Sequence, residues 1–116
     1  LEGGEGDDVL DGGTETAGIG DTADYSGVTA SVEVDLSQNL AIDDGFGDED
    51  TLIDIENVAG GSASDILLGD AQDNTITGNG GDDTLYGGGG SDALYGGSGD
   101  DTLIAHDGLL QGDAGP

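Results

Sequence analysis

The stretch that decides the fold runs from residue 60 to residue 104 and reads GGSASDILL GDAQDNTIT GNGGDDTLY GGGGSDALY GGSGDDTLI. It divides without gaps into five blocks of nine, and the last three follow G-x-x-G-x-D-x-U-x throughout, where U is a large apolar residue. Position six is held by Asp65, Asn74, Asp83, Asp92 and Asp101. Position eight is held by Leu67, Ile76, Leu85, Leu94 and Leu103. Self-similarity at a fixed short period predicts a repetitive architecture built from one small unit.

Each block has the chemistry of a tight turn followed by a short strand. Glycine at several turn positions permits left-handed backbone. Three residues such as 84–86 form a minimal strand whose middle side chain points to one side. Two blocks then make one coil of turn, strand, turn and strand, and the strands of successive coils stack about 4.8 Å apart in parallel sheets. The sequence therefore predicts an all-β fold with a thin core of position-eight side chains.

The charge of the chain is unusual, because its 116 residues include 27 acids and no Lys or Arg. Such a chain has no electrostatic footprint for nucleic acid or for an anionic membrane. The absence of Cys excludes a thiolate metal site and a thiol nucleophile. Low apolar content with high net charge is typical of disorder unless a positive partner folds the chain. Asp outnumbers Glu 21 to 6 and lies beside Gly, and short carboxylates in such turns are ligands for a hard cation such as calcium.

Stacked coils bring position-six side chains that are 18 residues apart into register. Carboxylates stacked in this way repel one another, whereas calcium between them makes them ligands. The spacing predicts three sites, which join the turns of Asp65 and Asp83, of Asn74 and Asp92, and of Asp83 and Asp101. The second site is expected to be the weakest, because Asn74 is uncharged and Gln72 replaces a turn glycine. The alternative is an acidic, metal-free linker, which has no reason to keep an aliphatic residue at every ninth place.

The blocks resemble the RTX nonapeptide, the hemolysin-type calcium-binding repeat, and a further copy, GGEGDDVLD, spans residues 3–11. The resemblance implies a right-handed parallel β-roll (a β-helix or solenoid) with calcium ions between its turns, about three of them in residues 60–104 and more elsewhere if other turns bind. The side chains that it implies as ligands are Asp8, Asp65, Asn74, Asp83, Asp92 and Asp101. The turn residues that it implies, largely through backbone carbonyls, are Gly60, Gly78, Asn79, Gly80, Gly81, Gly87, Gly89, Gly96 and Ser98.

The chain is expected to have four parts: an N-terminal nonapeptide repeat (1–11), a β-rich connector (12–59), five repeats (60–104) and a degenerate, truncated end (105–116). The connector resembles a segment found between RTX blocks through its DTADYS and IENV stretches. Alternation over residues 31–36 predicts a half-buried strand, residues 40–42 a short return strand, and residues 51–59 a degenerate coil with Glu56 at the Asp position and Val58 in the core. The acidic loop 43–50, which contains Asp43, Asp44, Asp48, Glu49 and Asp50, is either one more calcium site or a solvated loop.

No catalytic residue is expected in this chain. His106 is a lone histidine near the end, and Gly87–Gly90 has no following Lys with which to hold phosphate. Outward side chains at positions seven and nine form an apolar column, which we expect to pack against segment 12–59 or a neighbouring domain. Its members are Ile66, Leu68, Thr84, Tyr86, Thr102 and Ile104.

The resemblance implies a calcium-triggered folding module of a secreted, extracellular bacterial protein that is exported unfolded by type I secretion. Its partners are then calcium ions and the neighbouring domains or repeats of the same parent chain. One alternative is a non-catalytic accessory module of a secreted hydrolase or polysaccharide-modifying enzyme. Another is an adhesin or ice-binding array, which only Thr75 and Thr77 favour as an outward threonine rank. Because the chain begins and ends inside repeat-like sequence, we expect it to be a piece of a longer array.

Overall fold

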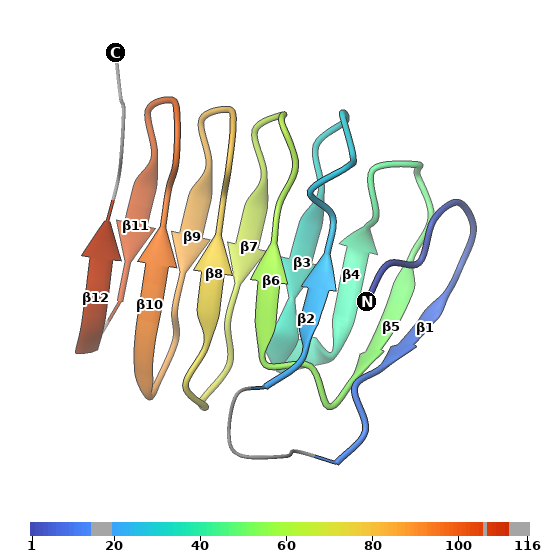
Figure 1. The fold of residues 1–116 in the computed structure, drawn as a ribbon, viewed down its shortest axis with the longest axis horizontal. Coiled ribbons are helices and arrows are strands. Elements are labelled where there is room, and N and C mark those ends of the chain that lie inside the picture. The colour runs from blue at the N-terminus through green and yellow to red at the C-terminus, as the bar shows by residue number, and fades with distance from the viewer. Residues whose placement is uncertain (15–19, 106, 112–116) are drawn as a thin grey trace.

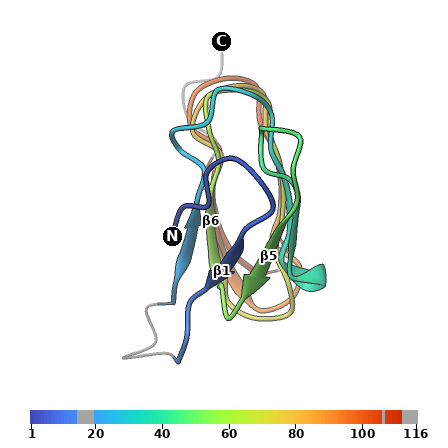
Figure 2. The same cartoon turned by 90° about the vertical axis from the view of Figure 1, so that its right-hand side faces the viewer.

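The computed structural model describes residues 1–14, 20–105 and 107–111, with side chains up to residue 105, and in this part the chain is all-β with a single 3-10 turn. The strands form two sheets that face each other across a narrow interior, with the turns above and below (Figures 1 and 2). The described part contains no helix that is long and apolar enough to cross a membrane. His106 and the last residues of the degenerate end, 112–116, lie outside the described residues.

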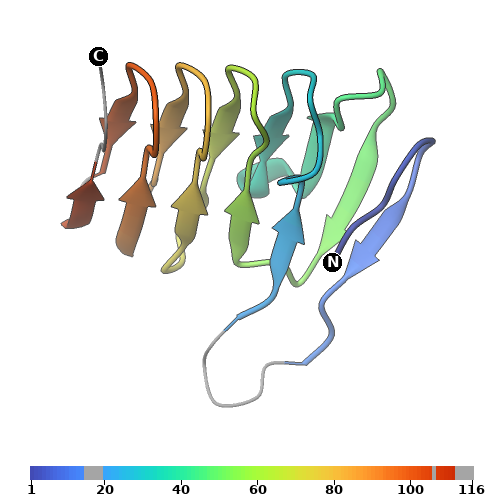
Figure 3. The ribbon, with the colours of Figure 1, turned by 45° about the horizontal axis from the view of Figure 1, so that its top comes forward.

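One sheet has seven strands in the order β1-β5-β4-β3-β7-β9-β11, and the other has five in the order β12-β10-β8-β6-β2. The first consists of β1 (Val9–Asp11), β3 (Glu33–Asp35), β4 (Leu40–Asp43), β5 (Asp50–Ile53), β7 (Ile66–Leu68), β9 (Thr84–Tyr86) and β11 (Thr102–Ile104). The second consists of β2 (Thr22–Asp24), β6 (Asn57–Ala59), β8 (Thr75–Thr77), β10 (Ser91–Tyr95) and β12 (Asp107–Gln111). The repeats thus contribute strands alternately to the two sheets, and Figure 3 shows their coils following one another along the molecule.

The predicted 18-residue register is confirmed in both sheets. In the seven-stranded sheet Leu85 pairs in parallel with Leu67 on one side and with Leu103 on the other. In the five-stranded sheet Ile76 pairs with Leu94. Parallel pairing of identical short units keeps every position-eight side chain on the inner face, because successive side chains of a strand alternate between faces.

The seven-stranded sheet is mixed, because the connector interrupts the parallel arrangement of the repeats within residues 33–53, where the expected return strand at 40–42 is found as β4. Strand β4 pairs antiparallel with β3 and with β5. The reason is the length of the connections, since a parallel return needs a crossover of a dozen residues or so, whereas a short link allows only antiparallel pairing. The link from β3 to β4 is η1 (Leu36–Gln38), which Asp35 caps by accepting from Ser37 N and which ends at left-handed Asn39 (φ 59°).

The core lies between the sheets and joins the repeats to the connector. Position-eight residues of the first four repeats in segment 60–104 are fully buried, whereas Leu103 is only partly buried. The predicted burial of Val32, Val34, Leu36 and Val58 in the connector is confirmed. The connector also buries Ala23, Tyr25, Ala41, Leu52 and Ile55. One hydrophobic core therefore spans both parts of the chain.

The outward apolar column lies on strands β7, β9 and β11, and the described residues of the connector do not cover it. Ile66, Tyr86 and Ile104 remain exposed at 43%, 38% and 48%. The connector reaches only one edge of the column, where Asp35 and Ser37 share a shallow pocket with Leu68 and Tyr86. Of the two coverings expected for this column, segment 12–59 is wrong for its described residues, because they extend the sheet at its edge instead of lying on its outer face. A neighbouring domain stays a prediction.

Candidate metal centres in the turns

The position-six side chains point into the turns and are removed from solvent. Asp65, Asn74, Asp83 and Asp92 are each no more than 2% exposed. A carboxylate fits there because position one of the same block is glycine. At Gly78, for example, a Cβ atom would collide with the carboxylate of Asp83 and approach the carbonyl oxygen of Gly96. Glycine at position one is therefore required by the inward carboxylate.

These side chains also link successive coils. Oδ1 of Asp83 accepts from the backbone N–H of Asp65, 18 residues earlier, at 2.8 Å. Oδ1 of Asp101 accepts from Asp83 N at 2.8 Å, and Oδ1 of Asp92 accepts from Asn74 N at 2.9 Å. The repeat pattern predicts these residues only as metal ligands, yet one oxygen of each carboxylate already accepts a hydrogen bond from a neighbouring coil.

The other carboxylate oxygen is where a cation is required. Among the described residues, five buried side-chain oxygens have no hydrogen-bond partner: the Oδ2 atoms of Asp8, Asp44, Asp83, Asp92 and Asp101. A buried anionic oxygen without a partner carries its full desolvation penalty. The same burial raises the pKa of Asp83 to about 6, and the negative charges of Asp65 and Asp101 add to the effect. Burial also raises the pKa values of Asp65 and Asp92.

Side chains alone do not complete a metal site in the described part of the chain, where no three His, Cys, Asp or Glu side chains are grouped to hold an ion. Calcium accepts six to eight oxygens, and backbone carbonyls serve as well as carboxylates. The turns offer such carbonyls, since those of Gly78, Gly87 and Gly96 lie close to the position-one glycines of the preceding coil. The residues present therefore fit calcium if carbonyls supply most of the shell.

The expected turn residues lie in the same turns as the position-six side chains, although several of their polar groups already form hydrogen bonds within the chain. Asn79 Nδ2 donates to the carbonyl of Gly60 at 2.7 Å, and Ser98 N donates to the carbonyl of Asn79 at 2.8 Å. Gly80 N and Gly89 N also donate to carbonyls of the preceding coil. The position-one glycines Gly60, Gly78, Gly87 and Gly96 each lie against the position-six carboxylate of their own block, and Gly81 lies against the backbone of Ala63.

The N-terminal repeat stacks on the acidic loop of the connector. Asp8 N donates to Oδ1 of Asp50 at 3.0 Å, across 42 residues, as Asp65 N does to Asp83 within the repeats. Asp50 is fully buried, and its Oδ2 accepts from the hydroxyl of Tyr25 at 3.0 Å. Sequence reasoning missed this role. The signal was present, because residues 45–53 read GFGDEDTLI and match the repeat at positions one, six and eight.

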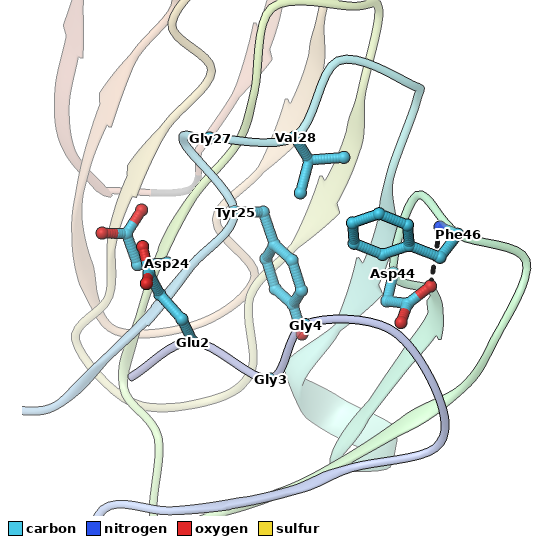
Figure 4. A pocket seen from close by; sticks show the side chains of 9 residues that line it. All are labelled: Glu2, Gly3, Gly4, Asp24, Tyr25, Gly27, Val28, Asp44 and Phe46. Atoms are coloured by element: carbon cyan, nitrogen blue, oxygen red, sulfur yellow. Dashed lines mark hydrogen bonds between the residues drawn. The ribbon is translucent and has the colours of Figure 1, made fainter.

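Two other carboxylates of the acidic loop, those of Asp43 and Asp44, accept hydrogen bonds from backbone N–H groups of the same loop. Oδ1 of Asp43 accepts from Gly45 N, and Oδ1 of Asp44 accepts from Phe46 N and Asp48 N. Asp44 is nevertheless 1% exposed, and its Oδ2 is one of the unpartnered oxygens. Asp44 lines a pocket of about 180 Å³, and Figure 4 shows it there together with Gly3, Gly4, Tyr25 and Phe46. A separate calcium site in this loop stays a prediction.

Comparison with known proteins agrees with the geometry of the turns. A family model described as the RTX calcium-binding nonapeptide repeat matches the chain in four copies, over residues 1–15, 59–94 and 87–108. No curated protein matches the chain.

Proposed function

The chain belongs to the RTX calcium-binding nonapeptide-repeat family, and from this premise we propose that it is a module whose turns bind calcium and whose folding is completed by that binding. The observation that supports the proposal best is the set of unpartnered, buried Oδ2 atoms in the turns of Asp83, Asp92 and Asp101. Without a cation these oxygens oppose the folded state. With one they become ligands, so metal binding and folding share one equilibrium.

The residues proposed to hold the ions are the position-six side chains together with turn carbonyls. Calcium supplies positive charge at the point where the chain has none of its own, since the sequence has no Lys or Arg. The chain's own residues do the remaining work. The first oxygen of Asp83 and of Asp101 fixes the side chain to the preceding coil, and glycine at position one leaves room for it. The second oxygen is then held in place for the ion.

Because binding and folding are coupled, the concentration of free calcium controls whether the chain folds. Extracellular modules bind calcium at roughly 10⁻⁴–10⁻³ M, so the chain would stay expanded at low calcium and fold outside the cell. Secretion by the type I route is typical of the family. We propose the same role here, with residues 60–104 as the calcium-binding array, residues 1–11 as a separate repeat, 12–59 as the connector and 105–116 as a degenerate end.

A role within a larger secreted protein fits the exposed apolar column. Repeat domains of this family are generally non-catalytic, so an accessory module of a secreted hydrolase or polysaccharide-modifying enzyme remains a second candidate. Ile66, Tyr86 and Ile104 lie on one sheet face and would be the surface for a neighbouring domain of the parent chain. An adhesin or ice-binding array remains a third proposal, which no observation in the structure favours.

Circular dichroism in the far ultraviolet tests the proposal directly. The chain should give a disordered spectrum in EDTA and a strand spectrum in millimolar calcium, with magnesium at the same concentration as the control for ionic strength. Magnesium should be less effective, because it prefers strict octahedral geometry and keeps several of its waters. Equal strand content in EDTA and in calcium would refute coupled binding and folding.

A further inference from the structure

The repeat turns fall into two classes according to the backbone at positions two and four. In turns 3–8, 78–83, 87–92 and 96–101 both positions are left-handed. Their φ values are 100° and 99° (Gly4, Gly6), 73° and 94° (Asn79, Gly81), 83° and 81° (Gly88, Gly90), and 83° and 110° (Gly97, Gly99). In turns 60–65 and 69–74 neither position is left-handed. We name the first class open turns and the second class capped turns.

The backbone class decides whether the position-six side chain has a partner within its own turn. In the capped turns the position-two N–H donates to it, from Gly61 to Asp65 Oδ2 at 2.8 Å and from Asp70 to Asn74 Oδ1 at 3.0 Å. A left-handed residue rotates its peptide planes, and the open turns make no such bond. Their position-six Oδ2 atoms, those of Asp8, Asp83, Asp92 and Asp101, are all buried and unpartnered.

The capped turns are also the ones that stack directly on the connector. Oδ1 of Asp65 accepts from Val32 N at 2.9 Å. Nδ2 of Asn74 donates to the carbonyl of Glu56 at 2.7 Å and to Asp70 Oδ1 at 3.2 Å. Hydrogen bonds within the chain thus link the connector to the first two repeats of segment 60–104, and we call this contact the junction. Among the described turns, the open ones lie on either side of this junction, three in β8–β11 and one beside β1 (Figure 1).

We propose that each of the four open turns takes one calcium ion and that the two capped turns are metal-free spacers, in place of the paired sites that the 18-residue spacing predicts, an inference that rests on the proposed calcium-binding function. In an open turn an ion removes the penalty of a buried, unpartnered anionic oxygen. In a capped turn the ion must first displace an N–H donor that already satisfies the oxygen. Ion binding therefore centres on Asp8, Asp83, Asp92 and Asp101. Turn 3–8 has a further unpartnered oxygen nearby, since Asp44 lines the same pocket as Gly3 and Gly4 (Figure 4).

Calorimetric calcium titration of matched variants of the full chain tests this assignment. Asp83→Asn and Asp65→Asn make the same chemical change in an open and in a capped turn. Asp83→Asn should lower the number of bound ions by one. Asp65→Asn should lower stability but leave the number of ions unchanged, because its turn holds none. Circular dichroism at saturating calcium verifies that each variant folds.

A gain-of-site variant keeps the test decisive if Asp83→Asn fails to fold. The triple change Asp70→Gly, Gln72→Gly and Asn74→Asp gives turn 69–74 the glycines and the carboxylate of an open turn, and it should add one ion. If the unaltered chain binds no calcium, the proposed function itself fails. If the unaltered chain binds calcium but Asp65→Asn removes an ion as Asp83→Asn does, or if the triple variant adds none, the division into open and capped turns is wrong while the function stands.

Discussion

Replacing Leu85 with Ala should raise the calcium concentration needed for folding by a calculable factor. Leu85 is 0% exposed and pairs with Leu67 and Leu103 in the seven-stranded sheet. Buried Leu→Ala changes cost about 2–5 kcal/mol, the larger values where the site cannot collapse around the cavity. Strands on both sides hold the backbone of Leu85 in place, so we expect about 3 kcal/mol.

Coupling to calcium converts this loss into a shift of the folding midpoint. When folding takes up n ions, each tenfold change in free calcium is worth about 1.4n kcal/mol, so with four ions a loss of about 3 kcal/mol moves the midpoint about 3.5-fold. A calcium titration followed by far-ultraviolet circular dichroism measures it. Thr84→Ala, at an exposed neighbouring position, is the matched control, and Leu103→Ala should shift the midpoint less because Leu103 is only partly buried. A midpoint for Leu85→Ala equal to that of Thr84→Ala would refute the reasoning.

Three further predictions follow from individual contacts. Tyr25→Phe removes the hydroxyl that donates to the buried Asp50, so urea denaturation in saturating calcium should show a loss of about 1.5–3 kcal/mol, and an unchanged midpoint would contradict it. Burial raises the pKa of Asp83 to about 6 in the calcium-free fold, so this fold binds the proton more tightly than the unfolded chain does. In EDTA the residual strand content should therefore be greatest below about pH 4 and fall as the pH rises through 6. Asp83→Asn should abolish this pH-dependent fall. Gly81→Ala introduces a side chain at φ 94° and places a Cβ 2.5 Å from the carbonyl oxygen of Ala63. The free energy of unfolding in calcium should therefore fall by more than about 1 kcal/mol in the same denaturation assay. An unchanged free energy of unfolding would argue against the left-handed turn.

The strands of the repeats could be predicted because every signal for them is local. Positions seven to nine form strands β7, β8, β9 and β11 at their expected residues, and β10 begins only two residues early. Position eight is the middle residue of each three-residue strand, so its side chain must face inward if the sheets stack at all. The nine-residue period thus determined both the register of the sheets and the core.

The connector could be predicted less well, because its partners are distant in sequence. The alternation of Val32, Val34 and Leu36 showed which side chains are buried. It could not show that β3 pairs with β7 on one side and with β4 on the other. The sequence pattern predicts Asp50 as part of an acidic loop, whereas in the structure it takes the position-six role opposite Asp8 across 42 residues. That pairing depends on how the two loops stack.

The sequence by itself determined the repeat period, the inward aliphatic position, the acidic turns and, through them, a cation as partner. The tertiary structure decided which turns leave a carboxylate oxygen unpartnered. Gly61 and Gly88 occupy the same repeat position and are chemically identical, yet only Gly88 is left-handed. Gly61 lies against the carbonyl oxygens of Val28 and Tyr25, so the connector is its neighbour where another repeat turn flanks Gly88. Glycine accepts either backbone conformation, and only the coil packed against it selects one.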